Sequence, residues 1–372
     1  MKATLGYVPE LDGLRGIAVS AVMILHSDEM FLRGGFIGVD VFFVLSGFLI
    51  TTLLVQEFDS QHHVDLRKFY LRRALRLAPA LILLLTSFSF LSVLILDEDR
   101  ARSNLIDASI ALLYSSNWAT AFDLHPLNYL EHSWSLSIEE QFYVVWPPIL
   151  VTLLRVMPSK GRLLAAVSVL GIAAWCLRIY LGMRGSPLER LYYGLDTRAD
   201  ALLAGCALSL LLSLSASNGQ PQLLERGLRV LAPLSGLALV SIAVFADWHS
   251  IHVHYWGLPA VALFTAVVIA HVVISPCGVV KSMLSSRLLV WLGTISYGLY
   301  LWHFPIFRTM RHFGLSGPEI LITGSAATLV VAAGSYYFLE RRFLQLKQQF
   351  TPSQSLHCGT PLLEQQPEAV RV

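Results

Sequence analysis

Residues 11–26, LDGLRGIAVSAVMILH, read as the start of a membrane helix, yet they include Arg15 and His26. An ionisable side chain at membrane depth is costly and usually has a function. Eleven residues along an α-helix make about three turns, so we expect both side chains on one face, roughly 16 Å apart. That distance is about half of the ~30 Å hydrocarbon layer. The stretch therefore predicts Arg15 near one membrane surface and His26 much deeper or towards the other.

The composition of the whole chain is that of a membrane protein. Of its 372 residues, 55% are hydrophobic and 14% are charged, with a mean hydropathy of +0.60. Soluble domains have about 25% charged residues, so a large soluble core is excluded. No phosphate-binding loop, dinucleotide fingerprint or nucleic-acid motif is present, and we expect no nucleic-acid partner. The cysteines show no metal-ligand spacing, and the histidines of WHSIHVHYW (248–256) are interpreted as a solvated loop, so no metal is expected.

Ten apolar segments are long enough to cross a membrane. They are 13–30, 36–56, 72–96, 137–154, 162–182, 199–214, 229–246, 255–275, 289–308 and 318–339. A further stretch, 104–121, is interrupted by YSSNW, and we interpret it as a re-entrant or half-spanning segment. The sequence thus predicts an all-α, polytopic bundle of about ten transmembrane helices. Residues 1–345 are expected to form this domain, and 346–372 a disordered cytoplasmic tail.

Basic residues predict how the bundle is oriented. With ten spans, the basic clusters within 67–76, 155–162, 281–287 and 341–347 all fall on one side of the membrane. The positive-inside rule makes that side the cytoplasm, where both termini also lie. Arg308 and Arg311 fall on the other side, against the rule. We therefore expect a multi-pass protein of the cytoplasmic (inner) membrane.

His26 has a candidate partner in the second span. The segment GVDVFFVLSGFLIT (38–51) places Asp40 near the outer end of that span, close to the expected depth of His26. A carboxylate that orients an imidazole, which then takes a proton from a hydroxyl, is a general-base arrangement. A core histidine hydrogen-bonded to a neighbouring helix is the alternative. Because Arg15 shares its face, we favour the catalytic interpretation for His26, Arg15 and Asp40.

Arginines gather near the predicted cytoplasmic end of the bundle. Arg73 and Arg76 lie one helical turn apart at the start of the third span, on the same side as Arg15. Guanidinium groups suit phosphate, so these three arginines could bind the phosphates of a nucleotide-like cofactor. Snorkelling to lipid headgroups would explain Arg15 alone. Positive-inside bias would explain the charge of the others, but not the use of Arg over Lys.

Candidate substrate-binding residues lie in two later segments. In HSWSLSIEEQFY (132–143), Ser137 and Glu140 fit a capping box, which leaves Glu139 to bind a polar substrate at the outer mouth beside Trp134. The segment LGTISYGLYLWHFPI (292–306) brings Tyr297 and His303 into one aromatic, hydroxyl-rich span. Such a wall suits a sugar or an acyl chain, and it also suits plain helix packing.

Four blocks in this order resemble acyltransferase family 3. They are Arg15 and His26 with ten residues between them, GVDVFFVLSGFLI, RRALR and WSLSIEEQFY. The resemblance extends to about residue 345. It implies a ten-span membrane O-acyltransferase that moves an acyl group, usually acetyl, from cytoplasmic acyl-CoA to a hydroxyl of an extracytoplasmic carbohydrate such as O-antigen or exopolysaccharide. Arg15 and His26 match the family's essential pair, and Arg73 and Arg76 match its arginine motif.

The resemblance implies acetyl-CoA as acyl donor, a carbohydrate or glycoside as acceptor and the lipid bilayer as surroundings. His26 would deprotonate the acceptor hydroxyl or accept the acyl group transiently, and both mechanisms stay open. Some members add an SGNH hydrolase-like domain; the short tail here favours a single-component transferase. One alternative is a macrolide or small-glycoside O-acyltransferase. Another is a proton-coupled transporter, and the lack of repeat symmetry argues against the transporter. A structural scaffold would leave Arg15 and His26 unexplained.

Overall fold

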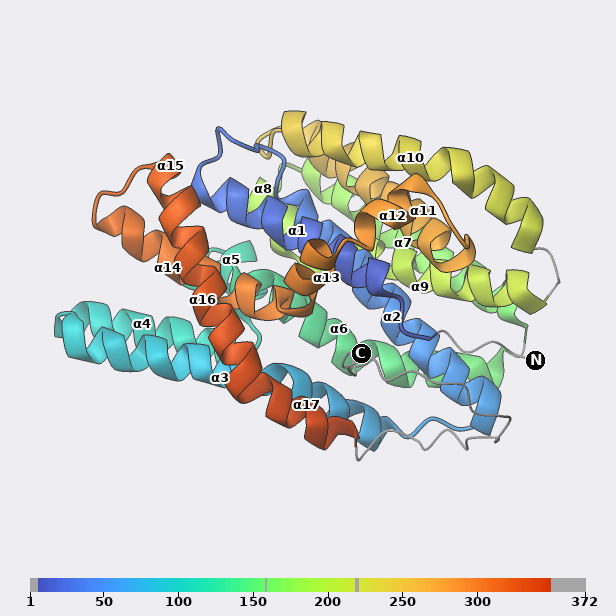
Figure 1. Ribbon diagram of the computed structural model, residues 1–372, viewed down its shortest axis with the longest axis horizontal. Coiled ribbons are helices and arrows are strands. Elements are labelled where there is room, and N and C mark those ends of the chain that lie inside the picture. Colours follow the sequence, from blue (N-terminus) through green and yellow to red (C-terminus); the bar gives the residue numbers. More distant parts are fainter. Residues whose placement is uncertain (1–5, 158, 218–220, 349–372) are drawn as a thin grey trace.

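The computed structural model describes residues 6–157, 159–217 and 221–348, and these residues form helices and no strand. The helices of the first half are α1 (Pro9–Ser27), α2 (Ile37–Gln61), α3 (Leu66–Ile95), α4 (Glu98–Leu112), α5 (Ser116–Ala121), α6 (Ser133–Val156), α7 (Lys160–Met183) and α8 (Leu188–Tyr193). Figure 1 shows α1 and α2 near the middle of the bundle and α3 beside α4 at one side of it.

The second half of the chain contains three π-helical turns, labelled η, among its α-helices. The elements are α9 (Leu195–Ser217), α10 (Pro221–Phe245), η1 (Val253–Gly257), α11 (Leu258–Ile274), α12 (Val279–Leu284), α13 (Arg287–Thr294), α14 (Ser296–His312), α15 (Gly317–Glu319), η2 (Ile320–Gly324), α16 (Ser325–Ser335), η3 (Tyr336–Glu340) and α17 (Arg341–Gln348). In Figure 1, α10 lies along the edge opposite α3 and α4.

Local sequence explains where the first helices begin. Proline suits the first turn of a helix, and acidic side chains there interact favourably with the helix dipole. α1 has Pro9 in this position, followed by Glu10 and Asp12. α3 begins after Asp65, whose carboxylate accepts a hydrogen bond from the backbone nitrogen of Lys68 at 3.0 Å. The apolar runs that follow each start then continue as helix.

Glycines allow the central helices to approach closely. A β-carbon added at Gly47 of α2 would overlap the carbonyl group of Leu202 in α9. Likewise, one added at Gly205 of α9 would overlap the carbonyl group of Val44 in α2. Small residues at helix interfaces permit such backbone contact in membrane proteins. The pair α2–α9 therefore forms a tightly packed centre.

Seven helical segments among the described residues are long and apolar enough to cross a membrane. They differ in how much of each is buried. In α2, 72% of the apolar stretch is buried inside the protein, whereas in α10 only 17% is buried. Each of the ten predicted spans falls on helix, but α1, α6 and α14 are not among the seven. The all-helical, membrane-type fold is confirmed, whereas the count of ten and the re-entrant segment stay predictions.

Several predicted boundaries were wrong. α6 begins at Ser133 rather than near residue 137, and the hydroxyl of Ser137 donates to the Ser133 carbonyl at 3.1 Å inside the helix, so the predicted capping box is absent. The expected single span 289–308 is divided between α13 and α14. The stretch 104–121 is covered by most of α4 together with α5. Of the predicted tail 346–372, residues 349–372 lie outside the described residues and 346–348 belong to α17.

Candidate active site

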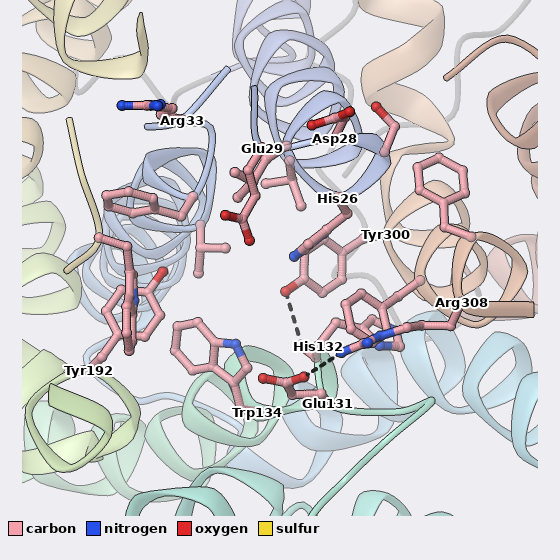
Figure 2. Close-up of a pocket in the computed structure, with 18 of the residues that line it drawn as sticks. His26, Asp28, Glu29, Arg33, Glu131, His132, Trp134, Tyr192, Tyr300 and Arg308 are labelled. Atoms are coloured by element: carbon pink, nitrogen blue, oxygen red, sulfur yellow. Dashed lines mark hydrogen bonds and ion pairs between the residues drawn. The ribbon is translucent and has the colours of Figure 1, made fainter. Parts of the chain in front are cut away.

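A wide cavity of about 980 Å³ lies at the end of α1 that carries His26. Its walls come from the last turn of α1, the 28–36 loop, the start of α6, α8 and α14. Figure 2 shows His26, Tyr300 and His132 on one side of this cavity and Trp134 and Tyr192 on the opposite side. The cavity thus places His26 beside aromatic and charged side chains.

His26 is held by a second histidine from α14. Its Nδ1 lies 3.0 Å from Nε2 of His303, and the two rings stack with centroids 5.2 Å apart. Nδ1 of His303 lies 3.1 Å from the carbonyl oxygen of Leu299. A backbone carbonyl only accepts hydrogen bonds, so this Nδ1 carries the hydrogen and, in the neutral ring, Nε2 accepts. His26 must then donate from Nδ1.

This order of donors determines which nitrogen of His26 can react. With Nδ1 protonated, the lone pair of a neutral His26 is on Nε2, which makes no hydrogen bond to another described residue. The partner on one imidazole nitrogen commonly determines the tautomer of the other. The edge of the His26 ring also meets Phe304, with centroids 4.9 Å apart. His26 is therefore positioned as a base or nucleophile beside the wide cavity.

A hydrogen-bonded group supports the wall next to His26. The Tyr300 hydroxyl donates to the carbonyl oxygen of His132 at 3.1 Å and lies 2.6 Å from the hydroxyl of Ser135. Nε2 of His132 donates to the carbonyl oxygen of Leu301 at 3.1 Å. These contacts connect α14 to the start of α6. They hold Tyr300 in place at the edge of the wide cavity.

Carboxylates outnumber arginines around the wide cavity. Its charged lining residues are Asp28, Glu29, Glu131, Glu189, Asp247, Arg33, Arg308 and Arg311. Arg308 pairs with Glu131 at 3.2 Å, and Arg311 donates to the carbonyl oxygen of Ser27 at 2.7 Å, which satisfies the end of α1. Hydrogen bonds from the backbone and ring of His249 lower the pKa of the exposed Asp247 carboxyl, which is therefore ionised at neutral pH.

The three predicted arginines converge on a second, narrow cavity of about 120 Å³. Arg15 pairs with Asp12 at 2.7 Å. Arg73 lies 3.4 Å from Glu140, and its guanidinium carbon is 2.9 Å from the centre of the Tyr143 ring. Arg76 lines the same cavity.

Arg76 is the arginine of this cavity that lacks a carboxylate partner. It forms no hydrogen bond or ion pair with another described residue, and its charge is repelled by those of Arg15 and Arg73 and attracted at longer range by that of Asp12. Clustered guanidinium groups with spare donors are a good site for an anion. This part of the structure therefore fits phosphate groups.

The two cavities meet. Val39 and Tyr300 line both of them, so these two side chains lie between the arginines of the narrow cavity and the space beside His26. Tyr297 lines the narrow cavity, with its hydroxyl donating to the carbonyl oxygen of Leu77 at 3.1 Å. Trp134 lines the wide one.

Three predicted placements were wrong. Asp40 does not contact His26: it lies on the face of α2 that packs against α9, and its Oδ1 accepts from Arg198 at 2.8 Å. Glu139 does not lie at the outer mouth, because α6 begins earlier than predicted; it lines the narrow cavity and accepts from Ser46 at 2.7 Å. His303 lines neither cavity and lies behind His26 instead.

Sequence reasoning missed Tyr192, Tyr193 and His132 in the lining of the wide cavity, where Arg198 supports the aromatic wall. The Arg198 guanidinium lies 4.6 Å from the Tyr192 ring centre and 5.9 Å from that of Trp134, so the buried pair with Asp40 supports the aromatic wall. The tyrosines of LYYG (191–194) gave no helical periodicity that would mark them. His132, an ionisable residue just before an apolar run, was a usable signal.

A comparison with known families decides the class of this protein. The family model described as an acyltransferase domain matches residues 8–339. The chain belongs to acyltransferase family 3. The family match includes every residue named above for the two cavities. No solved structure matches the chain.

Curated relatives of this family member carry O-acetyltransferase names. The chain is 37% identical to the putative peptidoglycan O-acetyltransferase YrhL of Bacillus subtilis over 90% of this chain and 54% of the relative. It is 36% identical to the peptidoglycan O-acetyltransferase OatA of Listeria monocytogenes over 90% of this chain and 55% of the relative. A putative O-acetyltransferase of Staphylococcus aureus is 33% identical over 91% of this chain and 57% of the relative. The chain thus spans about half the length of these relatives.

Proposed function

We propose that this protein transfers an acetyl group from cytoplasmic acetyl-CoA to a hydroxyl of an extracytoplasmic carbohydrate. The observation that carries the proposal is that the two cavities adjoin at Val39 and Tyr300, which brings an arginine cluster and a histidine to neighbouring sites. A transferase with a cytoplasmic donor and an extracytoplasmic acceptor must let both substrates reach one place from opposite sides of the membrane. In this proposal the arginine end and both termini face the cytoplasm of a multi-pass cytoplasmic membrane protein.

The narrow cavity is proposed to bind the donor. Arg15, Arg73 and Arg76 would hold the CoA phosphates, and the unpaired Arg76 supports this assignment. The small volume suits the slender pantetheine arm better than a sugar. The acetyl thioester would then extend past Val39 towards His26.

His26 is proposed to act at the acceptor hydroxyl. Its Nε2 would take the hydroxyl proton while the hydroxyl oxygen bonds to the thioester carbonyl carbon. The carbon–sulfur bond then breaks, and the CoA thiolate leaves and takes up that proton. In the alternative, Nε2 bonds to the thioester carbonyl carbon, and the carbon–sulfur bond breaks as CoA thiolate leaves. The acetyl group then passes from Nε2 to the hydroxyl oxygen, and the thiolate takes up the hydroxyl proton. The donation from Nδ1 to His303 supports both routes, because both need a lone pair on Nε2.

The wide cavity is proposed to bind the acceptor. Its aromatic and carboxylate lining suits the apolar faces and hydroxyl groups of a sugar. Relatives named peptidoglycan O-acetyltransferases make a peptidoglycan glycan the first acceptor to test. O-antigen and exopolysaccharide are further acceptors of the same class.

Labelled acetyl transfer in membranes tests this function. Membranes with wild-type protein or the His26→Ala variant would receive isotope-labelled acetyl-CoA and glycan fractions, and mass spectrometry would detect labelled product. Removing a general base costs roughly 100-fold to 10,000-fold, so we expect a loss of at least about 100-fold. His312→Ala, at an exposed histidine, is the matched control and should keep wild-type activity. Full activity of His26→Ala, with both variants equally abundant, would overturn the proposal.

A further inference from the structure

A second large recess adjoins the wide cavity. It has a volume of about 870 Å³ and is formed by residues 120–128 and 186–190 together with Glu131 and Arg308. Thr120, Glu131, Glu189 and Arg308 line both this recess and the wide cavity. The recess therefore adjoins the space beside His26, and it shares no lining residue with the narrow cavity.

We propose that this recess is a distal subsite for a chain of sugar residues. The acceptor is then an oligosaccharide or polysaccharide whose reacting residue lies beside His26 while its neighbours occupy the recess. This inference rests on the proposed transferase function. It deepens that function by specifying a chain, and it disfavours a monosaccharide or small glycoside as the acceptor.

Volume is the first argument for a chain. Ligand pockets commonly enclose about 300–1,000 Å³ for a drug-sized molecule. The wide cavity and the recess each reach the upper part of that range, at about 980 and 870 Å³. A single sugar beside His26 would leave most of this space to water. A chain of several residues would fill both parts.

The chemistry of the recess also suits sugar residues. The Phe122 ring is 55% exposed there and stacks on Trp118, with centroids 5.6 Å apart and planes at 15°. Arg190 lies 5.4 Å from the centre of the Phe122 ring and is itself fixed by a two-point pair with Asp196 at 2.9 and 2.5 Å. A rigid, exposed aromatic ring among polar groups offers a surface for the apolar face of a sugar.

The charged residues of the recess indicate which sugar chains it can bind. The arginines of the recess, Arg190 and Arg308, are paired with Asp196 and Glu131. Asp123 and Glu189 form no ion pair with a described residue and remain as acceptors for hydroxyl groups. A chain bearing a negative charge on each residue would be repelled by them. The proposed acceptor is therefore a neutral or amino-sugar chain.

A length series tests the distal subsite. Membranes with wild-type protein would receive labelled acetyl-CoA with mono-, di-, tetra- and hexasaccharides of N-acetylglucosamine, and in parallel with glycan fragments of peptidoglycan of increasing length. We expect kcat/KM to rise at least about tenfold from the shortest to the longest acceptor, equivalent to ~1.4 kcal/mol of extra binding. Oligomers carrying a carboxylate on each residue should react at least about tenfold more slowly than neutral ones of equal length.

The Phe122→Ala variant locates the effect in the recess. It should reduce the ratio of kcat/KM for the longest acceptor over the shortest to near unity. Phe313→Ala removes another exposed ring, which lines none of the three cavities, and it should retain the wild-type ratio. Equal rates for short and long acceptors in the wild type, or an unchanged ratio in Phe122→Ala, would overturn this inference alone. Absence of transfer to every acceptor of both series would overturn the proposed function and this inference with it.

Discussion

The wide and narrow cavities differ in size, charge and construction. The wide cavity has a volume of about 980 Å³ and more carboxylates than arginines, whereas the narrow one has about 120 Å³ and three arginines. Loops at 28–36 and 247–249 contribute to the wide cavity, and Figure 2 shows Asp28, Glu29 and Arg33 of the first loop. All residues of the narrow cavity lie on α1, α2, α3, α6 and α14.

This difference suggests how one bundle can keep its donor and change its acceptor. Loops tolerate substitution better than packed helices do. Under the proposed function, the helical cavity selects the donor by shape and charge. The loop-rimmed cavity then accepts different carbohydrates without disturbing the donor site.

We expect the largest effect from blocking the place where the wide and narrow cavities adjoin. Val39→Phe places a ring where the cavities meet, so the thioester would no longer reach His26. Because a misplacement of about 1 Å can cost 100-fold in rate, we expect acetyl transfer to fall at least ~100-fold. Binding of labelled acetyl-CoA to purified protein should change little.

The exposed residue Val144, on α6, provides the control. Val144→Phe adds the same ring away from all three cavities and should keep full transfer. If Val39→Phe abolished acetyl-CoA binding along with transfer, the donor site would extend beyond the narrow cavity. Unchanged transfer in Val39→Phe would contradict the path itself.

Helix positions could be predicted because they depend on local pattern. The predicted span 36–56 lies within α2 except for its first residue, and 162–182 lies within α7, since long apolar runs are visible in one sequence. The start of α6 was missed because serines alternate with apolar residues in its first turns, so no unbroken apolar run marks it. The break between α13 and α14 falls at Thr294–Ser296 and was missed because apolar residues lie close on both sides of it.

Contacts between distant helices could not be predicted in this way. Helical spacing placed Arg15 and His26 on one helix face, but it did not reveal which helix lies opposite. The partner of His26 is 277 residues away, and the partner of Asp40 is 158 residues away. Periodicity shows that a side chain faces inward, not which neighbour it meets. The convergence of the three arginines could be predicted because positive charges mark a common membrane side.

The charge of the narrow cavity can be tested with Arg73→Lys. Lysine keeps the positive charge but loses the planar group that lies against Tyr143 and the fork that can bind a phosphate at two points. Loss of about 1.4 kcal/mol would raise the KM for acetyl-CoA roughly tenfold. The KM for the acceptor should stay unchanged. Steady-state kinetics in membranes or detergent, with each substrate varied in turn, would measure both constants.

Arg67→Lys makes the same substitution on the first turn of α3, at an exposed residue outside the narrow cavity. It should leave both Michaelis constants at their wild-type values. An increase in acceptor KM in Arg73→Lys, with acetyl-CoA KM unaffected, would assign the arginine end to the acceptor and reverse the comparison.

The smallest expected effect comes from the opposite wall of the wide cavity. Figure 2 shows the nitrogen-bearing edge of Trp134 turned towards the cavity, and this indole nitrogen forms no hydrogen bond to a described residue. Trp134→Phe keeps an aromatic ring but removes the donor. A hydrogen bond contributes about 1 kcal/mol net, which corresponds to roughly a fivefold increase in acceptor KM. The acetyl-CoA KM should not change. Trp256→Phe, at an exposed ring that lines neither cavity, should alter neither constant. If Trp134→Phe instead raised the KM for acetyl-CoA, the donor would reach across the wide cavity, and the two cavities would not divide the substrates between them.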